Sequence, residues 1–243
     1  MNFDIPKINM SRPTYIVGGW VRDKILDSKS KPKDLDLAMV APSFEAMRES
    51  VIEAGGEIYL ESPQYLTIRC QIPGLGPVDV AMTRTDGEYT DGRRPDSTHI
   101  ADCIEDDLSR RDFTCNAIAV NVANGEVIDP FNGVNDINEY RLRTVRCAKD
   151  RFEEDYLRLF RALRFSITKA FDMDSDIDAA LRDRELCAGI KNISKERIRE
   201  EMLKCFNFNT FITVRYLNEY PNLLYWMCEQ GLSLKPTLEK LKS

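Results

Sequence analysis

Hydrophobic and polar positions alternate in short segments over the first 140 residues, and they follow a helical period from about residue 150 onward. Alternation predicts strands, whereas recurrence at every third or fourth position predicts helices. Strands are predicted at 14–17, 35–40, 65–72, 78–83, 117–122 and 126–128. Helices are predicted at 20–26, 44–54 and 104–110, and then at 150–170, 175–187, 194–206, 208–220 and 223–230. The pattern therefore predicts an α+β fold, in which a small mixed sheet is followed by an all-helical region.

Cap and turn residues separate several of these segments. Ser43 directly precedes the helix at 44–54, and serine is a favoured N-cap residue. Gly55-Gly56 follows that helix and ends it, because glycine readily adopts the left-handed conformation found at helix ends. Asn124-Gly125 lies between two short apolar segments, an arrangement typical of a β-hairpin turn.

The composition excludes several classes of protein. With 243 residues, 43% of them apolar and 30% charged, the chain can bury a core and is not disordered throughout. No apolar run reaches about 18 residues, so no membrane span is expected, and the first ten residues do not resemble a signal peptide. Seven cysteines without a C-x-x-C pair predict reduced packing residues of a cytoplasmic protein, and a single histidine excludes a histidine-based metal cluster.

Charge is distributed unevenly along the chain. Residues 1–140 carry 14 basic and 24 acidic side chains, whereas residues 141–243 carry 20 basic and 16 acidic ones. Acidic side chains in the first part can hold metal ions, and a basic stripe in the second part can bind phosphates. The alternative is that these charges are only the solvated faces of helices.

Asp34 and Asp36 stand two positions apart at the start of a predicted strand. Their side chains should point to the same face of the strand. Two close carboxylates repel unless a cation lies between them, and Mg²⁺ is commonly held by one or two carboxylates plus substrate phosphates. Asp79, on the strand at 78–83, is the candidate third carboxylate of a site for two Mg²⁺ ions. The alternative is a solvated aspartate pair, because a D-x-D pattern alone has low specificity.

A glycine pair lies just upstream of these aspartates. Gly18-Gly19 separates a predicted strand from a predicted helix, which lets the backbone approach a ligand and offers free N–H groups to a phosphate. Arg22 lies about one turn into the helix and can bind the same anion. The order of strand, glycine pair, helix and D-x-D strand places phosphate donors and metal ligands on one small sheet.

These residues resemble a known family. Gly18-Gly19, Arg22 and Asp23, followed by Asp34 and Asp36, are similar to the signature of the class II tRNA nucleotidyltransferases and bacterial poly(A) polymerases, within the polymerase-beta-like nucleotidyltransferase superfamily. Further segments follow in the family's order. Residues 105–117 resemble the motif that selects ribose, 129–137 the hinge between head and neck, 154–165 the neck motif that selects the base, and 193–198 the last motif.

The resemblance implies a role for individual residues. Asp34 and Asp36 would bridge two Mg²⁺ ions, with Asp79 on the side of the attacking hydroxyl. The residues implied in nucleotide binding are Gly18, Gly19 and Arg22 for the triphosphate, Arg110, Arg111 and Asp112 in the ribose motif, and Asp155, Arg158, Arg161 and Arg164 in the neck motif.

The neck motif also has a chemical basis of its own. On one continuous helix, Glu154, Arg158, Arg161 and Phe165 would form a single stripe, with Asp155 beside it. A carboxylate accepts a hydrogen bond from an exocyclic amine, and arginine donates to ring nitrogens and carbonyl oxygens. The pair of Asp155 and Arg158 can therefore act as a template for cytosine and adenine. The alternative is an ordinary intrahelical salt bridge on a solvated face.

The resemblance covers about residues 14–204 and implies a nucleotidyltransferase. It predicts a catalytic head at 1–140, a helical neck at 141–206 and a short helical segment at 207–243 that is an abbreviated form of the family's body. The implied reaction is template-independent addition of C and A from CTP and ATP to the 3′ end of tRNA, with release of pyrophosphate. RNA, mainly the tRNA acceptor end, is the expected partner, and a homo-oligomer is an open alternative. A poly(A) polymerase, an A-only or C-only enzyme, and a non-catalytic RNA-binding protein of the same fold remain alternatives.

Overall fold

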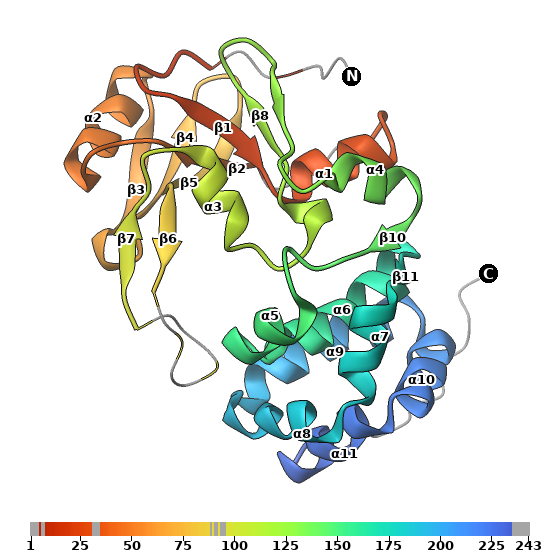
Figure 1. Ribbon diagram of the computed structural model, residues 1–243. Coiled ribbons are helices and arrows are strands. Elements are labelled where there is room, and N and C mark those ends of the chain that lie inside the picture. The colour runs from red at the N-terminus through yellow and green to blue at the C-terminus, as the bar shows by residue number, and fades with distance from the viewer. Residues whose placement is uncertain are drawn as a thin grey trace.

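A seven-stranded mixed sheet forms the first part of the protein, and helices form the second part (Figure 1). The computed structural model describes residues 5, 8–30, 35–87, 89, 92 and 96–234. The sheet has the strand order β3-β4-β5-β2-β1-β8-β9. Its strands are β1 (Thr14–Val17), β2 (Leu35–Met39), β3 (Glu57–Ser62), β4 (Thr67–Ile72), β5 (Gly76–Met82), β8 (Ala119–Asn121) and β9 (Val127–Ile128). The expected α+β class, with a mixed sheet followed by helices, is confirmed.

Within the described residues, four α-helices accompany the sheet and seven form the second part. The first group is α1 (Gly19–Leu26), α2 (Phe44–Glu53), α3 (Ile104–Ser109) and α4 (Gly133–Asn138). The second group is α5 (Ala148–Glu154), α6 (Leu157–Lys169), α7 (Ser175–Arg182), α8 (Arg184–Cys187), α9 (Lys195–Phe208), α10 (Thr210–Glu219) and α11 (Pro221–Glu229). Short 3₁₀ helices lie at Pro63–Tyr65, Thr114–Asn116 and Ala188–Asn192. No helix in the described ranges is long and apolar enough to cross a bilayer.

Two small sheets complete the fold. Strands β6 (Arg84–Asp86) and β7 (Thr98–Ile100) pair antiparallel, and β10 (Arg141–Leu142) pairs in parallel with β11 (Asp172–Met173). Neither pair was predicted, since two or three residues are too few to show alternation. The predictions also missed β3, whose side chains are mostly exposed because it lies at the edge of the sheet, and α4.

The two faces of the large sheet are covered differently. On one face, Leu37 and Val80 pack in the main core with Met47 and Val51 of α2. On the other face, a smaller cluster joins strands β1, β2 and β8 to α3 through Val17, Ala38, Ala119, Ile104 and Leu108. The face that bears α3 is the face of Asp36, because β1 residue Val17 and β2 residue Asp36 are register partners. Helix α3 therefore leaves the β5, β4 and β3 part of that face outside its cluster.

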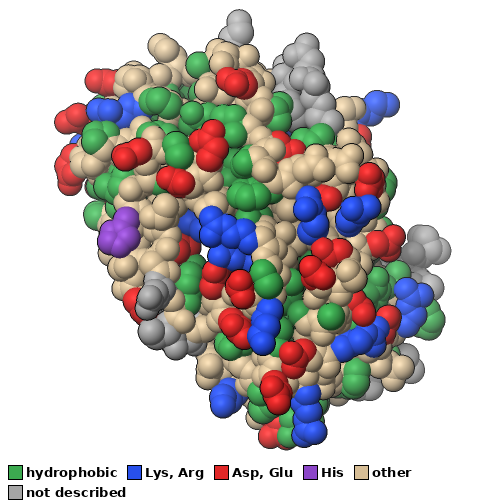
Figure 2. Space-filling view, in the orientation of Figure 1, with side chains coloured by type: hydrophobic (Ala, Val, Ile, Leu, Met, Phe, Trp, Pro, Cys, Tyr) green, Lys and Arg blue, Asp and Glu red, His purple; other side chains and the backbone are tan. Residues whose placement is uncertain are grey.

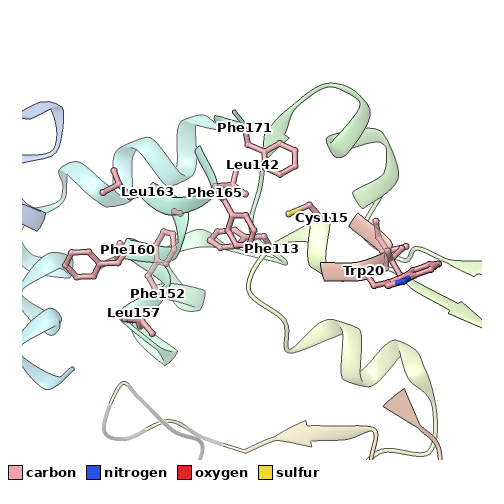
Figure 3. Packing of buried hydrophobic residues seen from close by; sticks show 14 of the residues in the cluster. Trp20, Phe113, Cys115, Leu142, Phe152, Leu157, Phe160, Leu163, Phe165 and Phe171 are labelled. Atoms are coloured by element: carbon pink, nitrogen blue, oxygen red, sulfur yellow. The ribbon is translucent and has the colours of Figure 1, made fainter. Parts of the chain in front are cut away.

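One hydrophobic core runs from the sheet into the helices. Figure 3 shows Phe113, which precedes the 3₁₀ helix at Thr114–Asn116, next to Phe165 of α6, and the two rings meet edge to face at 5.4 Å between centroids. Phe152, Phe160 and Leu163 continue this core among the neck helices. Since head and neck share buried aromatic side chains, burial of their common surface stabilises the arrangement of the two parts.

Two of the predicted helices are interrupted by aspartate. The prediction of one helix at 150–170 is wrong: Asp155 leaves the helical conformation (φ −146°, ψ 101°) and its carboxylate accepts a hydrogen bond from Leu157 N at 3.1 Å. The predicted helix at 175–187 breaks likewise at Asp183, whose carboxylate accepts from Glu185 N and Leu186 N. Aspartate side chains compete with helical hydrogen bonds in this way. Glu154 therefore lies on α5 and not on the same helix as Arg158.

The segment predicted as a hinge is a tightly bonded turn. Asn132 adopts the left-handed conformation (φ 60°), which asparagine tolerates better than most residues. The Asp129 carboxylate accepts from Gly133 N at 2.7 Å and from Val134 N at 2.9 Å. Buried Asp136 accepts from Thr114 Oγ1 at 2.6 Å and from Arg143 Nε at 3.0 Å, which joins head and neck.

Replacing Gly133 with alanine should destabilise this turn. A Cβ atom at Gly133 would lie 2.2 Å from the carbonyl oxygen of Thr114 and 3.0 Å from Ile118 Cγ1. Because backbone must shift to accept it, we expect a loss of about 1–3 kcal/mol, or roughly 2–12 °C in the melting temperature. Thermal unfolding measures the loss, and Asn138→Ala, an exposed change on the same helix, should stay within about 0.5 kcal/mol of the wild type.

The cysteines are all free thiols within the described structure. Four of them are buried, as the packing prediction expects, whereas Cys147 and Cys228 are exposed. Burial raises the pKa of Cys70 to about 11 and those of Cys187 and Cys205 to about 12. These buried thiols stay protonated at neutral pH and are poor nucleophiles.

Candidate nucleotide-binding site

A cavity of about 520 Å³ lies between the head and the neck. Residues from the head and residues from α6 and α9 line it together. The lining residues are Gly18, Gly19, Arg22, Asp36, Arg110, Arg111, Asp112, Asn116, Asp155, Leu157, Arg158, Arg161, Arg164, Phe165 and Arg197. All ten residues that the sequence predicts for nucleotide binding are in this set. The fold thus brings together segments that are more than 140 residues apart in the chain.

The charge of the lining favours an anion. Seven arginines face three aspartates among the lining residues. Figure 2 shows acidic side chains over the upper left of the molecule, around α2, and a group of basic side chains near the middle, where head and neck meet. A concave site with this excess of positive charge attracts phosphates.

The glycine turn forms one wall of the cavity. Gly18 has φ 71° and ψ −130°, a conformation that only glycine adopts readily, and it precedes α1. Arg22 follows one turn later and is buried; its Nη1 donates to Asn116 Oδ1 at 2.7 Å, and its Nε donates to Asp23 at 2.9 Å. The structure therefore holds the Arg22 guanidinium in place beside the start of the helix.

Arg110 and Arg111 are fixed by one buried carboxylate. Asp107 of α3 accepts from Arg110 Nη2 at 2.7 Å and from Arg111 Nη2 at 2.9 Å. Burial alone would raise the pKa of Asp107, but Arg111 and Arg110 outweigh this and lower it. Asp107 therefore stays ionised, and it orients two arginines that line the cavity.

Asp112 connects the head to the neck. Its Oδ2 accepts from Arg161 Nε at 2.7 Å, and its Oδ1 accepts from Asn116 Nδ2 at 2.9 Å. Burial tends to raise the pKa of Asp112, but Arg161 and the Asn116 hydrogen bond outweigh burial and hold the pKa well below its usual range. Because Asn116 also binds Arg22, a continuous chain of hydrogen bonds runs from Arg22 to Arg161.

In the neck, no described hydrogen bond joins the side chains of Asp155 and Arg158, although Arg158 N donates to the Asp155 carbonyl oxygen at 2.9 Å. The Asp155 carboxylate accepts from Arg197 Nη2 at 2.9 Å, whereas Arg158 Nη1 donates to Glu154 at 2.8 Å. Arg158 also donates to the carbonyl oxygen of Arg110 at 3.1 Å, which joins neck to head. Both side chains nevertheless line the same cavity.

Phe165 supports three arginines of the site. Its ring lies below the guanidinium groups of Arg164 at 4.3 Å, Arg22 at 5.0 Å and Arg161 at 5.8 Å from the centroid. The sequence places Phe165 on the same stripe as the arginines, but the ring is buried, with 1% exposure, rather than exposed at the front. Cation–π contacts of this kind limit where the three guanidinium groups can point.

Asp36 lies at the edge of the cavity with an exposed side chain, and Asp34 lies outside the described residues. On the neighbouring parallel strand, Asp79 is the register partner of Asp36, as expected for two carboxylates on one face. Asp79 accepts two hydrogen bonds from Arg69, at 2.6 and 2.9 Å, and lines a second cavity of about 210 Å³ instead of the first.

The donor chemistry of this edge fits Mg²⁺. An exposed carboxylate beside a phosphate-binding wall is the usual arrangement, in which substrate phosphates complete the ligand set. Within the described ranges, no three histidine, cysteine or acidic side chains are grouped to hold a metal ion by themselves. Asp36 would therefore share the ion with Asp34 and with the substrate.

Several residues of the site were not predicted from the sequence. Arg197 lies in the last motif and was not among the predicted site residues, yet it lines the cavity and binds Asp155. Asp107 binds both Arg110 and Arg111. Asn116 binds Arg22, and Glu201 binds Arg164. The signal for Asp107 and Asn116 was their place inside the ribose motif, whereas nothing local in the sequence indicated Glu201.

The fold joins an α/β head to a helical second part, with an arginine-rich cavity between them. A family model described as "Poly A polymerase head domain" matches residues 14–143, and the chain belongs to this family. The chain is 36% identical over 190 residues to the CCA-adding enzyme of Leuconostoc citreum, covering 78% of this chain and 44% of that protein. It is 37% identical over 191 residues to the CCA-adding enzyme of Lactobacillus delbrueckii subsp. bulgaricus, covering 78% and 45%.

Solved structures give the same result for the fold. The CCA-adding enzyme of Bacillus stearothermophilus in complex with CTP matches with a TM-score of 0.69 at 32% identity, covering 85% of this chain and 47% of that one. An apo form of a CCA-adding enzyme matches with a TM-score of 0.74 at 25% identity, covering 88% and 50%. The chain spans about half the length of the curated relatives that it matches.

Proposed function

We propose that the protein is a template-independent RNA nucleotidyltransferase that adds C and A to the 3′ end of tRNA from CTP and ATP. The observation that carries the proposal is one cavity that joins the glycine turn, Asp36 and seven arginines. The chain's membership of the poly(A) polymerase head domain family supports the same reaction, and so do its relatives named CCA-adding enzymes. RNA, chiefly the tRNA acceptor end, is the proposed partner.

In this proposal the head binds the phosphates and the sugar. Gly19 N–H and the Arg22 guanidinium bind the triphosphate. In the ribose motif, which also contains Arg110, Arg111 binds the triphosphate or the ribose and Asp112 holds the loop. Asp34 and Asp36 would hold two Mg²⁺ ions, with Asp79 on the side of the attacking hydroxyl. When bound, these ions lower the pKa of the RNA 3′-hydroxyl and stabilise the leaving oxygens.

The neck would select the base. Asp155 can accept a hydrogen bond from the exocyclic amine of cytosine or adenine, and Arg158 can donate to a ring nitrogen or carbonyl oxygen. Arg161 and Arg164 contribute positive charge at the same wall. In the proposed domain organisation, the head spans 1–140, the neck 141–206 and a short C-terminal segment 207–243. The proposed location is the cytoplasm, where thiols stay reduced.

The decisive assay offers the purified protein a tRNA that lacks CCA. Each nucleotide is supplied alone and then CTP is combined with ATP, and a sequencing gel resolves the products. Two C residues followed by one A support the proposal. A long A tail would identify a poly(A) polymerase, single-nucleotide products an A-only or C-only enzyme, and no addition an RNA-binding protein of the same fold. Sedimentation of the same sample determines whether the protein forms a homo-oligomer.

Replacing Arg158 with alanine should relax the choice of base. The variant loses a donor to the edge of the base, so discrimination between CTP and UTP should fall by about 1–3 kcal/mol, or roughly five- to 150-fold in the ratio of kcat/KM. Arg182→Ala, which removes an exposed arginine of α7, is the matched control. An unchanged ratio in Arg158→Ala, with a cooperative unfolding transition retained, would refute the template role.

A further inference from the structure

The second cavity lies on the sheet face that bears Asp36, on the β3, β4 and β5 part that the α3 cluster does not include. Its lining comes from three adjacent strands and the turn before β4: Leu60, Ser62, Tyr65, Thr67, Arg69 and Asp79. The register pairs Leu60 with Arg69 and Arg69 with Asp79, so these side chains form a row across β3, β4 and β5. The lining of the first cavity includes no residue of this row, and only Asp79 has a place in the proposed catalytic group.

The two cavities lie on opposite sides of Asp36 and Asp79. Along the sheet, the order is β4, β5, β2, β1. The glycine turn that lines the first cavity follows β1, Asp36 stands on β2, Asp79 stands on β5, and Arg69 stands on β4. Since neighbouring strands are about 4.8 Å apart, the two carboxylates separate the cavities by little more than their own width.

We propose that the second cavity binds the 3′-terminal nucleotide of the acceptor RNA. This inference rests on the proposed function. In phosphoryl transfer the attacking and leaving oxygens lie roughly in line on opposite sides of phosphorus. If the triphosphate occupies the first cavity, the attacking 3′-hydroxyl must arrive from the other side of the carboxylates. The second cavity is a hollow of the described structure on that side.

The side chains of this cavity suit the end of a single RNA strand. Tyr65 is 54% exposed and Leu60 is 51% exposed, which leaves an aromatic ring and an aliphatic side chain open to a base. Aromatic rings bind unpaired bases by stacking, without strong dependence on sequence. At about 210 Å³, the cavity is below the size of roughly 300–1,000 Å³ typical of sites that enclose a whole small molecule. It therefore fits a chain end that enters from solvent better than it fits a free nucleotide.

The Arg69–Asp79 pair gives the site a means of responding to RNA. Both side chains are partly exposed, 55% and 39%, and ion pairs of this kind contribute little to stability. A phosphate of the RNA can therefore replace Asp79 as the partner of Arg69 with little loss of free energy. Arginine binds phosphate in the same bidentate way as it binds carboxylate. When the RNA end binds, this exchange of partners releases the Asp79 carboxylate from Arg69. Asp79 lies on the side from which the 3′-hydroxyl must attack.

Tyr65 is tested with a matched tyrosine. Tyr65→Ala should raise the KM for tRNA lacking CCA about five- to tenfold and leave the KM for CTP unchanged. Tyr59→Ala removes a ring of equal exposure, 53%, from β3 outside the cavity and should change neither value. With an acceptor whose terminal nucleotide is abasic, the wild-type KM for RNA should rise as much as it does in Tyr65→Ala with the normal acceptor. Combining the variant with the abasic acceptor should raise this KM no further. Additive losses would overturn the stacking contact.

Arg69 is tested by salt dependence. Arg69→Ala should weaken RNA binding and reduce the slope of log K against log salt by about one, because one phosphate contact is lost. Arg48→Ala removes an arginine of similar exposure that pairs with Glu61 outside the cavity, and it should leave the slope unchanged. An unchanged slope in Arg69→Ala would overturn the phosphate contact.

A crosslink separates this inference from the proposed function. A tRNA that ends in 4-thiouridine is irradiated with the full chain, and the attached peptide is identified by mass spectrometry. Attachment within 60–69 supports the site, even if the RNA is not extended, in which case only the proposed function fails. Extension of the RNA with attachment elsewhere overturns the site alone. Protection of 60–69 by a second protein chain, with no RNA crosslink, would indicate a protein interface and also overturn the site.

Discussion

Asp36→Ala should abolish nucleotide addition while the protein remains folded. Asp36 is the described carboxylate of the expected metal pair, and it lines the same cavity as the seven arginines. Its side chain is exposed, so its removal leaves no cavity in the core and breaks none of the buried ion pairs described above. Loss of several kcal/mol of transition-state stabilisation corresponds to a fall of about 10³-fold or more in kcat/KM.

Single-turnover extension of tRNA lacking CCA, with excess CTP and Mg²⁺, measures this loss. Circular dichroism and thermal unfolding should match the wild type, and the affinity for RNA should change by less than about threefold. Asp102→Ala, which removes another exposed aspartate of the head, should retain near-normal activity. Extension by Asp36→Ala at more than about a tenth of the wild-type rate would contradict the assignment of the catalytic edge.

Local patterns predicted those parts of the head that short-range chemistry determines. Ser43 accepts from Ala46 N at 3.2 Å and begins α2 as its N-cap. The Asn124-Gly125 turn joins β8 to β9, with Gly125 at φ 76°. Alternation also placed Asp36 and Asp79 on one face, which the register of β2 and β5 confirms. Each of these predictions depends on residues within a few positions or on the two-residue period of a strand.

The neck was predicted less well because its deciding contacts are not local. The helical period continues across Asp155, so the pattern cannot show that this side chain binds Leu157 N and ends α5. The ion-pair partners of the arginines could not be predicted for the same reason. Glu201 binds Arg164, which is 37 positions away in the chain, and Asp112 binds Arg161, which is 49 positions away. Sequence identified six of the seven arginines of the cavity, all but Arg197, but it did not identify Asp107 and Glu201, which orient three of them.

Asp112→Ala should remove a large part of the stability of the head–neck junction. The change leaves the Arg161 guanidinium without its buried partner and breaks the chain that reaches Arg22 through Asn116. Removing one partner of a buried ion pair costs about 3–5 kcal/mol. Because the Arg161 side chain is still 31% exposed, we expect a value near the lower limit, about 3 kcal/mol. The affinity for CTP should fall as well, since Arg22 and Arg161 both line its proposed site.

Urea unfolding followed by tryptophan fluorescence tests this expectation, since Trp20 and Trp226 report on the head and on the last helix. Glu139→Ala removes an acid from an exposed ion pair with Arg141 and should cost less than about 1 kcal/mol. A loss of that same small size in Asp112→Ala would show that the buried carboxylate does not hold head and neck together.

The pH dependence of the stability lost in Asp112→Ala shows whether the ionised carboxylate or the shape of the side chain accounts for that loss. The folded-state pKa of Asp112 is lower than the unfolded value of about 3.9, because Arg161 and Asn116 outweigh burial. A carboxylate with a depressed pKa contributes stability that is complete above the unfolded pKa and is lost as the pH falls through the folded pKa. The difference in unfolding free energy between the wild type and Asp112→Ala should therefore be constant from about pH 5 to 7 and should narrow below about pH 4. A difference that stays constant down to about pH 2.5 would mean that shape, not the ionised carboxylate, accounts for the loss.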